Sequence, residues 1–116
     1  MLLAEERIEL FVAVDAYNVT IQNAASAAGL AFVDAKSIVQ EMVESGYPSG
    51  DFIFTGDLVT GGAFSLDGLH PNGRGNALIA NEIMKAIDAA YGSNFEASGN
   101  LLNVGDFPTN YSPLLP

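Results

Sequence analysis

The chain contains one histidine, His70, which stands three residues after Asp67 in the stretch FSLDGLHPNGRG, residues 64–75. A neutral imidazole can take a proton from a hydroxyl group near neutral pH. It does this well when its other ring nitrogen donates a hydrogen bond to a carboxylate, which fixes the tautomer and stabilises the imidazolium. The pair therefore predicts the acid and the base of a nucleophilic hydrolysis site, whose nucleophile remains to be located.

The residues around this pair predict a supported loop at the start of a helix. Gly68 permits backbone angles that larger residues resist, and Pro71 stiffens the exit from the loop. Asn72 is a good N-cap for a helix that runs from about Gly73 to Tyr91, with Gly92 as its expected stop. The predicted apolar face of that helix consists of Ile79, Ile83, Ile87 and Ala90.

The spacing alone leaves a second interpretation open, in which Asp67 caps a local amide and His70 is simply solvated. A metal site is disfavoured, because one histidine and one aspartate are too few ligands and the chain has no cysteine. No motif in the chain indicates a cofactor.

The charge balance excludes some classes of partner. The formal net charge of −10, from 14 acidic and 4 basic residues, opposes binding to phosphate backbones and anionic lipid headgroups. The four basic residues are scattered, and they are Arg7, Lys36, Arg74 and Lys85. No apolar run approaches the ~20 residues that a membrane-spanning helix needs. We therefore expect neither nucleic-acid binding nor an integral membrane protein.

The remaining pattern predicts an α/β order. A long helix from about Leu3 to Ala28 precedes a short apolar run, Leu30–Val33, which suits a strand buried on both faces of a parallel sheet. A second, shorter helix follows and ends near Gly46. The apolar face of the first helix consists of Leu10, Val14, Tyr17, Ile21, Ala24 and Ala28, and that of the second consists of Ile38, Val39, Met42 and Val43.

Further expectations concern the loops and the domain limits. Phe52–Phe54 and Leu58–Val59 are expected to pair as a small hairpin. Residues 1–92 are expected to belong to one domain and residues 93–116 to a loop-rich C-terminal tail. Because Leu30–Val33 is the one predicted core strand, its hydrogen-bonding neighbours must lie on missed strands or on another polypeptide.

The longer string GGAFSLDGLHPNGRGNALIANEIMKAIDAAYG, residues 61–92, closely resembles the C-terminal block of the SGNH hydrolases, also called GDSL-type lipases or acylhydrolases. In that family an Asp-x-x-His-Pro element supplies the acid and the base of a Ser–His–Asp triad. The resemblance therefore implies that Asp67 is the triad acid and His70 the general base. The string NVTIQNAASAAGLAFVDA, residues 18–35, is similar to the penultimate helix and strand of the family, so the resemblance covers roughly Leu10 to Tyr91.

The serine and oxyanion-hole blocks of that family are not recognisable in this sequence. Ser49 lies in a predicted loop, Leu58 stands where a GDSL-like block would have its serine, and Ser65 is too near Asp67 to act as an independent nucleophile. The other serines fall on helical patterns or in the tail, and they are Ser26, Ser37, Ser45, Ser93, Ser98 and Ser112. Three asparagines on helical patterns lack the loop context of an oxyanion-hole residue, and they are Asn18, Asn23 and Asn81.

The resemblance thus implies the C-terminal part of a three-layer αβα domain, flavodoxin-like, with about five parallel strands of which this chain holds the last. It implies an ester hydrolase fragment that is inactive alone, an ester substrate for the parent enzyme, and export of that parent. We expect the missing N-terminal half of the domain, or a second copy of the chain, to cover the exposed apolar faces. The alternative is a non-catalytic, acidic α/β association module in which Asp67–Pro71 is only a stiff turn.

Overall fold

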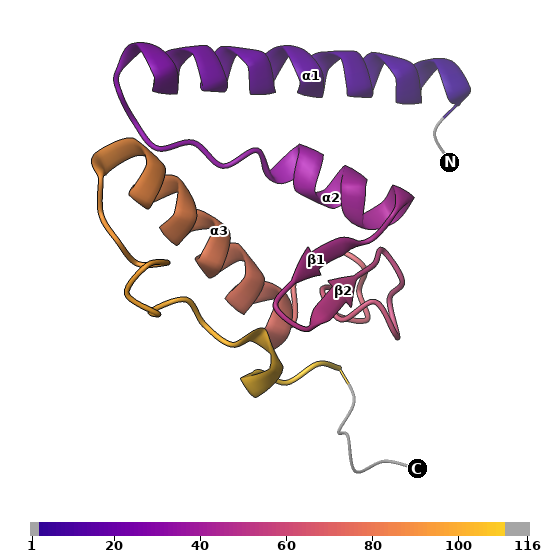
Figure 1. Ribbon diagram of the computed structural model, residues 1–116. Helices are drawn as coiled ribbons and strands as arrows, with labels where there is room; N and C mark the ends of the chain where they lie inside the picture. Colours follow the sequence, from indigo (N-terminus) through magenta and orange to yellow (C-terminus); the bar gives the residue numbers. More distant parts are fainter. Residues whose placement is uncertain (1–2, 111–116) are drawn as a thin grey trace. The chain divides into compact units, whose positions relative to one another are not determined.

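The computed structural model describes residues 3–110 and shows a mixed α/β chain (Figure 1). Within that range it has three α-helices, one two-stranded antiparallel sheet and one short 3-10 helix, η1. The packing divides the chain into two units, residues 1–32 and residues 33–116. Each unit is described by itself.

The first unit consists mainly of helix α1, Ala4–Ala27, which confirms the long helix predicted from the sequence. The Glu6 carboxylate accepts a hydrogen bond of 2.7 Å from the Leu3 N–H at its start. Gly29, with φ of +65°, follows its end in the left-handed region, where glycine is favoured. No residue of α1 is buried, although apolar side chains occur all around it.

The predicted strand Leu30–Val33 is not present, and this prediction was wrong for the chain as described. Residues 30–33 have no regular secondary structure, and the one sheet within residues 3–110 is the antiparallel pair β1–β2. The physical reason is that a strand is defined by hydrogen-bonded neighbours, which an apolar run does not supply by itself. The mixed α/β composition holds, but the described part of the chain contains no parallel sheet.

A hairpin that contains Phe52–Phe54 is present, but the strand that pairs with this segment differs from the predicted one. Strand β1, Tyr47–Ser49, pairs antiparallel with β2, Phe52–Phe54, so Leu58–Val59 is not its second strand. The connection is Gly50–Asp51, in which Gly50 has φ of +58°. A two-residue turn with glycine in the left-handed region suits the twist of a hairpin. This local turn signal determines the pairing.

Helix α2, Ala35–Glu44, confirms the second predicted helix. The Asp34 carboxylate caps it by accepting from the Ser37 N–H at 3.0 Å and from the Ser37 hydroxyl at 2.7 Å. Its buried residue is Met42, and Gly46, with φ of +85°, follows its end.

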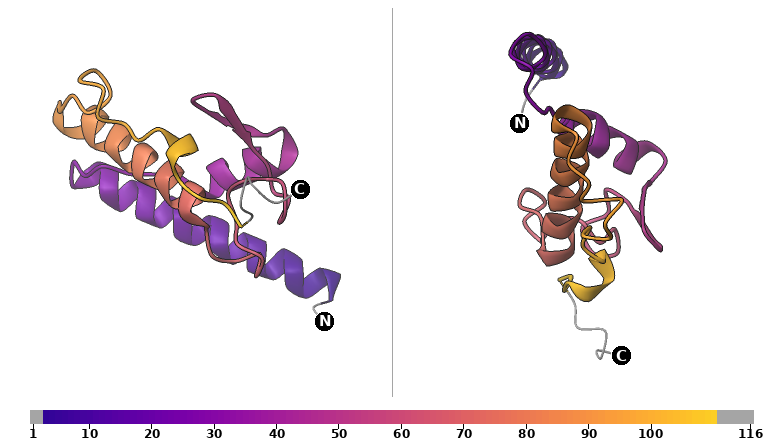
Figure 2. Two further views of the ribbon diagram at one scale, coloured as in Figure 1. Left: turned by 90° about the horizontal axis from the view of Figure 1, so that it is seen from below. Right: turned by 60° about the vertical axis from the view of Figure 1, so that its left-hand side comes forward.

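Helix α3, Gly73–Tyr91, also confirms its prediction, with Asn72 as N-cap and Gly92 as C-cap at φ of +68°. After Gly92 the chain returns along the helix, as both views in Figure 2 show. The Asn81 side chain fixes this return, because it donates to the Leu102 carbonyl at 2.9 Å and accepts from the Leu102 N–H at 2.7 Å. The described part of the predicted tail is therefore held to α3 at Leu102, and its buried residue is Val104. Residues 111–116 lie outside the described residues.

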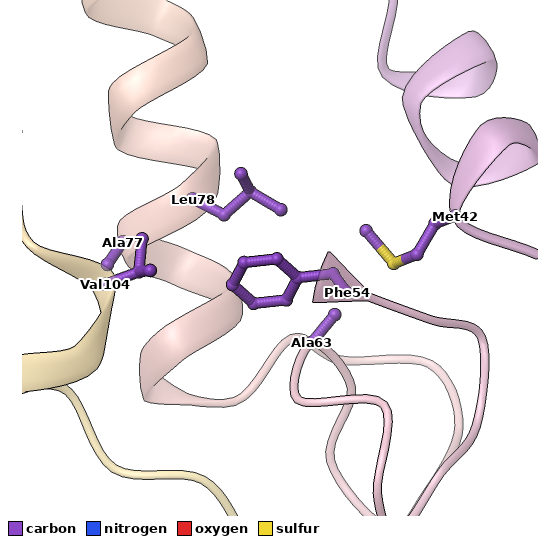
Figure 3. Packing of buried hydrophobic residues seen from close by; sticks show 6 residues of the cluster. All are labelled: Met42, Phe54, Ala63, Ala77, Leu78 and Val104. Atoms are coloured by element: carbon purple, nitrogen blue, oxygen red, sulfur yellow. The ribbon is translucent and has the colours of Figure 1, made fainter. Parts of the chain in front are cut away.

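The core of the second unit is small. It consists of Met42, Phe54, Ala63, Ala77, Leu78 and Val104. Figure 3 shows the Phe54 ring pointing from β2 towards Leu78 of α3. Val104 belongs to η1, Val104–Asp106, and reaches this core from beyond α3.

The buried face of α3 differs from the predicted one. Its buried residues are Gly75, Ala77, Leu78 and Asn81, whereas Ile79 and Ile83 are exposed. The predicted apolar face is therefore not the face that packs into the core of the described chain. Hydrophobic periodicity identifies a face that prefers burial, but the residues available to pack decide which face is covered.

Candidate active-site loop

Asp67 and His70 form a direct pair on the loop before α3. Oδ2 of Asp67 lies 2.6 Å from Nδ1 of His70. The His70 side chain is 74% exposed and that of Asp67 51%, so the pair lies at the surface. Because Nδ1 faces the carboxylate, Nε2 is the ring nitrogen that remains for proton transfer.

The other carboxylate oxygen of Asp67 is held by three donors. Oδ1 accepts from the Ser65 hydroxyl at 2.6 Å, from the Leu69 N–H at 2.9 Å and from the His70 N–H at 2.9 Å. These hydrogen bonds, first that of Ser65 and then that of the His70 ring, hold the pKa of Asp67 well below its ordinary value of 3.8. The carboxylate is therefore ionised at neutral pH and fixed in orientation.

Ser65 supports the carboxylate, and the sequence reasoning missed this role. The sequence ruled it out as a nucleophile because it stands too near Asp67, and its hydroxyl indeed donates to that carboxylate at 2.6 Å. The available signal was the Ser-x-Asp spacing, since serine and aspartate side chains commonly form local hydrogen bonds in turns. Ser65 thus positions Asp67, which in turn positions His70.

Backbone hydrogen bonds close the loop at its base. The Ser65 N–H donates to the His70 carbonyl at 2.8 Å, and the Gly68 N–H donates to the Ser65 carbonyl at 3.0 Å. Gly68 has φ of +69°, a conformation that L side chains rarely adopt. The tight turn at Gly68 is what brings the two ends of Asp67–His70 together, as the sequence predicted for this glycine.

Two asparagines tie the loop to the rest of the second unit. Asn72 donates from its side chain to the Phe64 carbonyl at 3.2 Å, while its Oδ1 caps α3 by accepting from the Gly75 N–H at 2.9 Å. Asn110 donates to the same Phe64 carbonyl at 2.6 Å. Hydrogen bonds therefore attach the loop to the first turn of α3 through Asn72 and to the segment after α3 through Asn110.

The described chain brings no nucleophile to the pair. Within residues 3–110, no serine hydroxyl is hydrogen-bonded to the His70 ring. Ser49 is buried at the end of β1, and Asn81 is engaged with the Leu102 backbone. Neither residue supplies a hydroxyl or an oxyanion donor at the loop.

The structure also bears on metal and membrane association. Residues 3–110 contain no group of three or more His, Cys, Asp or Glu side chains that could hold a metal ion. None of the helices in the same range has the length and apolar character needed to cross a bilayer.

An apolar cavity of about 250 Å³ lies beside the loop. It is lined by side chains of α2 and α3 and by residues on both sides of His70, among them Val39, Ile79, Leu69 and Pro71. The sequence pattern did not indicate it, because a cavity depends on the packing of separate elements.

Comparison of the chain with protein-family models, with curated proteins and with solved structures finds no match. Function must therefore be argued from the geometry of the loop. An ionised, fixed Asp67 beside the imidazole can hold His70 in one tautomer and stabilise its protonated form. The arrangement can accept a proton from a hydroxyl placed at Nε2 and return it to a leaving group.

Proposed function

We propose that Asp67 and His70 are the acid and the base of an SGNH-type ester hydrolase whose nucleophilic serine comes from polypeptide outside these 116 residues. The observation that carries the proposal is the 2.6 Å contact between Oδ2 of Asp67 and Nδ1 of His70. Three further donors to Oδ1 support it, because they fix the carboxylate that orients the imidazole. The resemblance of residues 61–92 to the C-terminal block of that family supplies the reaction class.

The proposed reaction is acyl transfer in two steps. The serine Oγ attacks the ester carbonyl carbon while Nε2 of His70 takes the Oγ proton. The ester C–O bond then breaks, and the same proton passes from Nε2 to the departing alcohol oxygen. Water attacks the acyl-serine with Nε2 again as base, which releases the carboxylic acid and restores the serine. Asp67 stays ionised throughout and stabilises the imidazolium.

The same proposal includes the finer fold. In the complete domain, Leu30–Val33 would pair as a parallel strand in the sheet of a three-layer αβα sandwich. The continuous apolar run of residues 30–33 supports this, because strands buried in a parallel sheet are continuous apolar runs.

Ester turnover tests the function. We expect the 116-residue chain to hydrolyse a short-chain aryl ester no faster than free imidazole does, since it lacks the nucleophile. The product of the full reading frame should be active, and His70→Ala should lower its kcat/KM by about 10⁴-fold or more. Asp51→Asn, at the exposed turn of the β1–β2 hairpin, is the matched control and should keep full activity. Unchanged turnover in His70→Ala would refute the assignment.

A second candidate function is a non-catalytic association module. The observation that favours it is the absence of any buried residue in α1, whose apolar side chains suit a protein interface. Labelling of the full product with a fluorophosphonate separates the two candidates. A reactive serine supports the hydrolase, and an unlabelled, inactive product supports the module.

A further inference from the structure

The Asp67–His70 pair has little packing of its own to hold it in place, since its side chains are 51% and 74% exposed. The hydrogen bonds from Ser65, Leu69 and His70 to the Asp67 carboxylate shape the loop internally. They do not fix where the loop lies relative to the rest of the second unit. That relation matters, because a misplacement of reacting groups by about 1 Å can lower a rate about 10²-fold. Contacts from outside the loop must therefore place the pair.

Asn110 makes two such contacts through one amide group. Its Nδ2 donates to the Phe64 carbonyl at 2.6 Å and to the Leu58 carbonyl at 3.2 Å. An amide nitrogen carries two hydrogens, so both of its donors are used. Asn72 donates to the same Phe64 carbonyl at 3.2 Å, and Asn110 therefore makes the shorter of the two bonds. Its partners stand 46 and 52 residues earlier in the chain.

The two carbonyls belong to the base of the loop and to the segment that covers its tip. Phe64 lies at the base, where it pairs with Pro71 in an antiparallel bridge. The Leu58 side chain lies over the tip, because a Cβ built on Gly68 would be 3.2 Å from its Cδ2. Gly68 directly follows Asp67. One amide thus connects both ends of the loop that carries the pair.

The segment that carries Asn110 is itself anchored. Val104 is 2% exposed and belongs to the core, and Phe107 packs against that core. The Pro108 carbonyl accepts from the Arg74 N–H, in the first turn of α3, at 3.0 Å. Asn110 follows two residues later. A donor on an anchored segment can fix the position of a loop, whereas a donor on a free segment would move with it.

We propose that Asn110 is a positioning residue for the Asp67–His70 pair, because its side-chain amide ties the base of the loop to the segment that covers its tip. The inference rests on the proposed function and adds to it a residue that touches neither the substrate nor the reacting atoms. In the assembled hydrolase these bonds set where Nε2 of His70 meets the serine hydroxyl. Loss of the Asn110 amide should slow proton transfer and leave substrate binding unchanged.

Steady-state ester hydrolysis by the product of the full reading frame tests the inference. Asn110→Ala should lower kcat by about 10- to 100-fold and keep KM within about twofold. Asn110→Asp, which keeps the shape but has no donor, should lower kcat at least as far. The matched control is Asn103→Ala in the same segment, because Asn103 bonds to Gly105 and Asp106 of η1. It should lower the urea midpoint similarly but leave kcat within about twofold of the wild type.

Leu58→Ala supplies a second, independent variant. It removes the side-chain contact at Gly68 and keeps the carbonyl that Asn110 binds, so kcat should fall by about three- to tenfold. The double variant with Asn110→Ala should lose less than the product of the two single losses, because both act through one loop. Fully multiplicative losses would overturn the inference. If Asn110→Ala does not fold, Leu58→Ala decides alone, and a wild-type kcat in that variant overturns it.

The outcomes separate this inference from the proposed function. Turnover that persists in His70→Ala refutes the proposed function. Turnover that requires His70 but keeps its wild-type kcat in Asn110→Ala and Asn110→Asp overturns the inference alone. A fall in kcat that Asn103→Ala matches also overturns it, since that result shows a general loss of stability. A rise in KM without a fall in kcat does the same, since it shows a role in substrate binding.

Discussion

Helix α1 and the loop–α3 region, residues 63–92, show two outcomes of the same kind of sequence pattern. Both helices were predicted from apolar periodicity, and both are present. No residue of α1 is buried, whereas α3 buries four residues: Gly75, Ala77, Leu78 and Asn81. Periodicity therefore predicts that a helix forms, and segments distant in sequence determine whether it is covered.

The loop–α3 region is covered because polar contacts bring other segments to it. The Arg74 N–H donates to the Pro108 carbonyl at 3.0 Å, and Asn81 holds the Leu102 backbone through both of its side-chain polar atoms. These bonds place Val104 of η1 in the core. The loop that carries Asp67 and His70 is built on this supported region.

The largest contrast should come from matched leucine substitutions in the two helices. Leu78 is 2% exposed, so Leu78→Ala should lower the free energy of unfolding by about 2–5 kcal/mol through lost burial and a cavity. Leu10→Ala in α1 should change it by less than about 0.5 kcal/mol, because Leu10 is exposed. Urea denaturation followed by circular dichroism measures both. Equal losses of stability would show that α1 is covered in solution. That result would contradict the contrast between an exposed α1 and a covered α3.

Gly75→Ala tests how closely α3 approaches the loop. A Cβ at position 75 would lie within van der Waals overlap of the Ala63 carbonyl and close to Pro71. In an open helix, Gly→Ala stabilises by reducing unfolded-state entropy. Here we expect a loss of about 1–3 kcal/mol in the same denaturation measurement, from overpacking against backbone. A gain in stability would mean that the loop can move away from α3.

Asn72→Ala should have a smaller effect, since it removes the α3 cap and the bond to the Phe64 carbonyl. We expect a loss of about 1–2 kcal/mol. Leu3→Ala at the start of α1 is the control, because the Leu3 side chain makes no cap bond and the bond from its backbone N–H to Glu6 is kept. Amide hydrogen exchange in the first turn of each helix would show whether only α3 frays.

The smallest effect concerns pH. The pKa of Asp67 lies below its ordinary value of 3.8, so its contribution to loop stability is present above about pH 4 and is lost only as pH falls through the depressed value. At about pH 3, where unperturbed aspartates are mostly protonated, Asp67 should remain ionised. Its carboxyl carbon chemical shift reports this by NMR. In Ser65→Ala the midpoint should rise towards 3.8, and an unchanged midpoint would contradict the positioning role of Ser65.

The local features of the fold and of the candidate site were predictable from the sequence. Helix limits followed from periodicity and from caps such as Asn72 and Gly92. The spacing left the Asp67–His70 pairing as one of two open interpretations, and the structure shows the contact. The hairpin partner was mistaken because the Gly50–Asp51 turn was overlooked. Residues 30–33 form no strand within the described chain, because a strand requires neighbours that no local pattern provides.

The sequence by itself determined the helices and the turn at Gly68, because these depend on hydrogen bonds and side chains a few residues apart. Only the tertiary structure decided that Leu78 rather than Ile79 is buried, and that a cavity opens beside His70. Burial and cavities depend on which distant segments meet. That difference in range is the physical reason why the helices and the Gly68 turn were predictable from the sequence while the surface beside the Asp67–His70 pair was not.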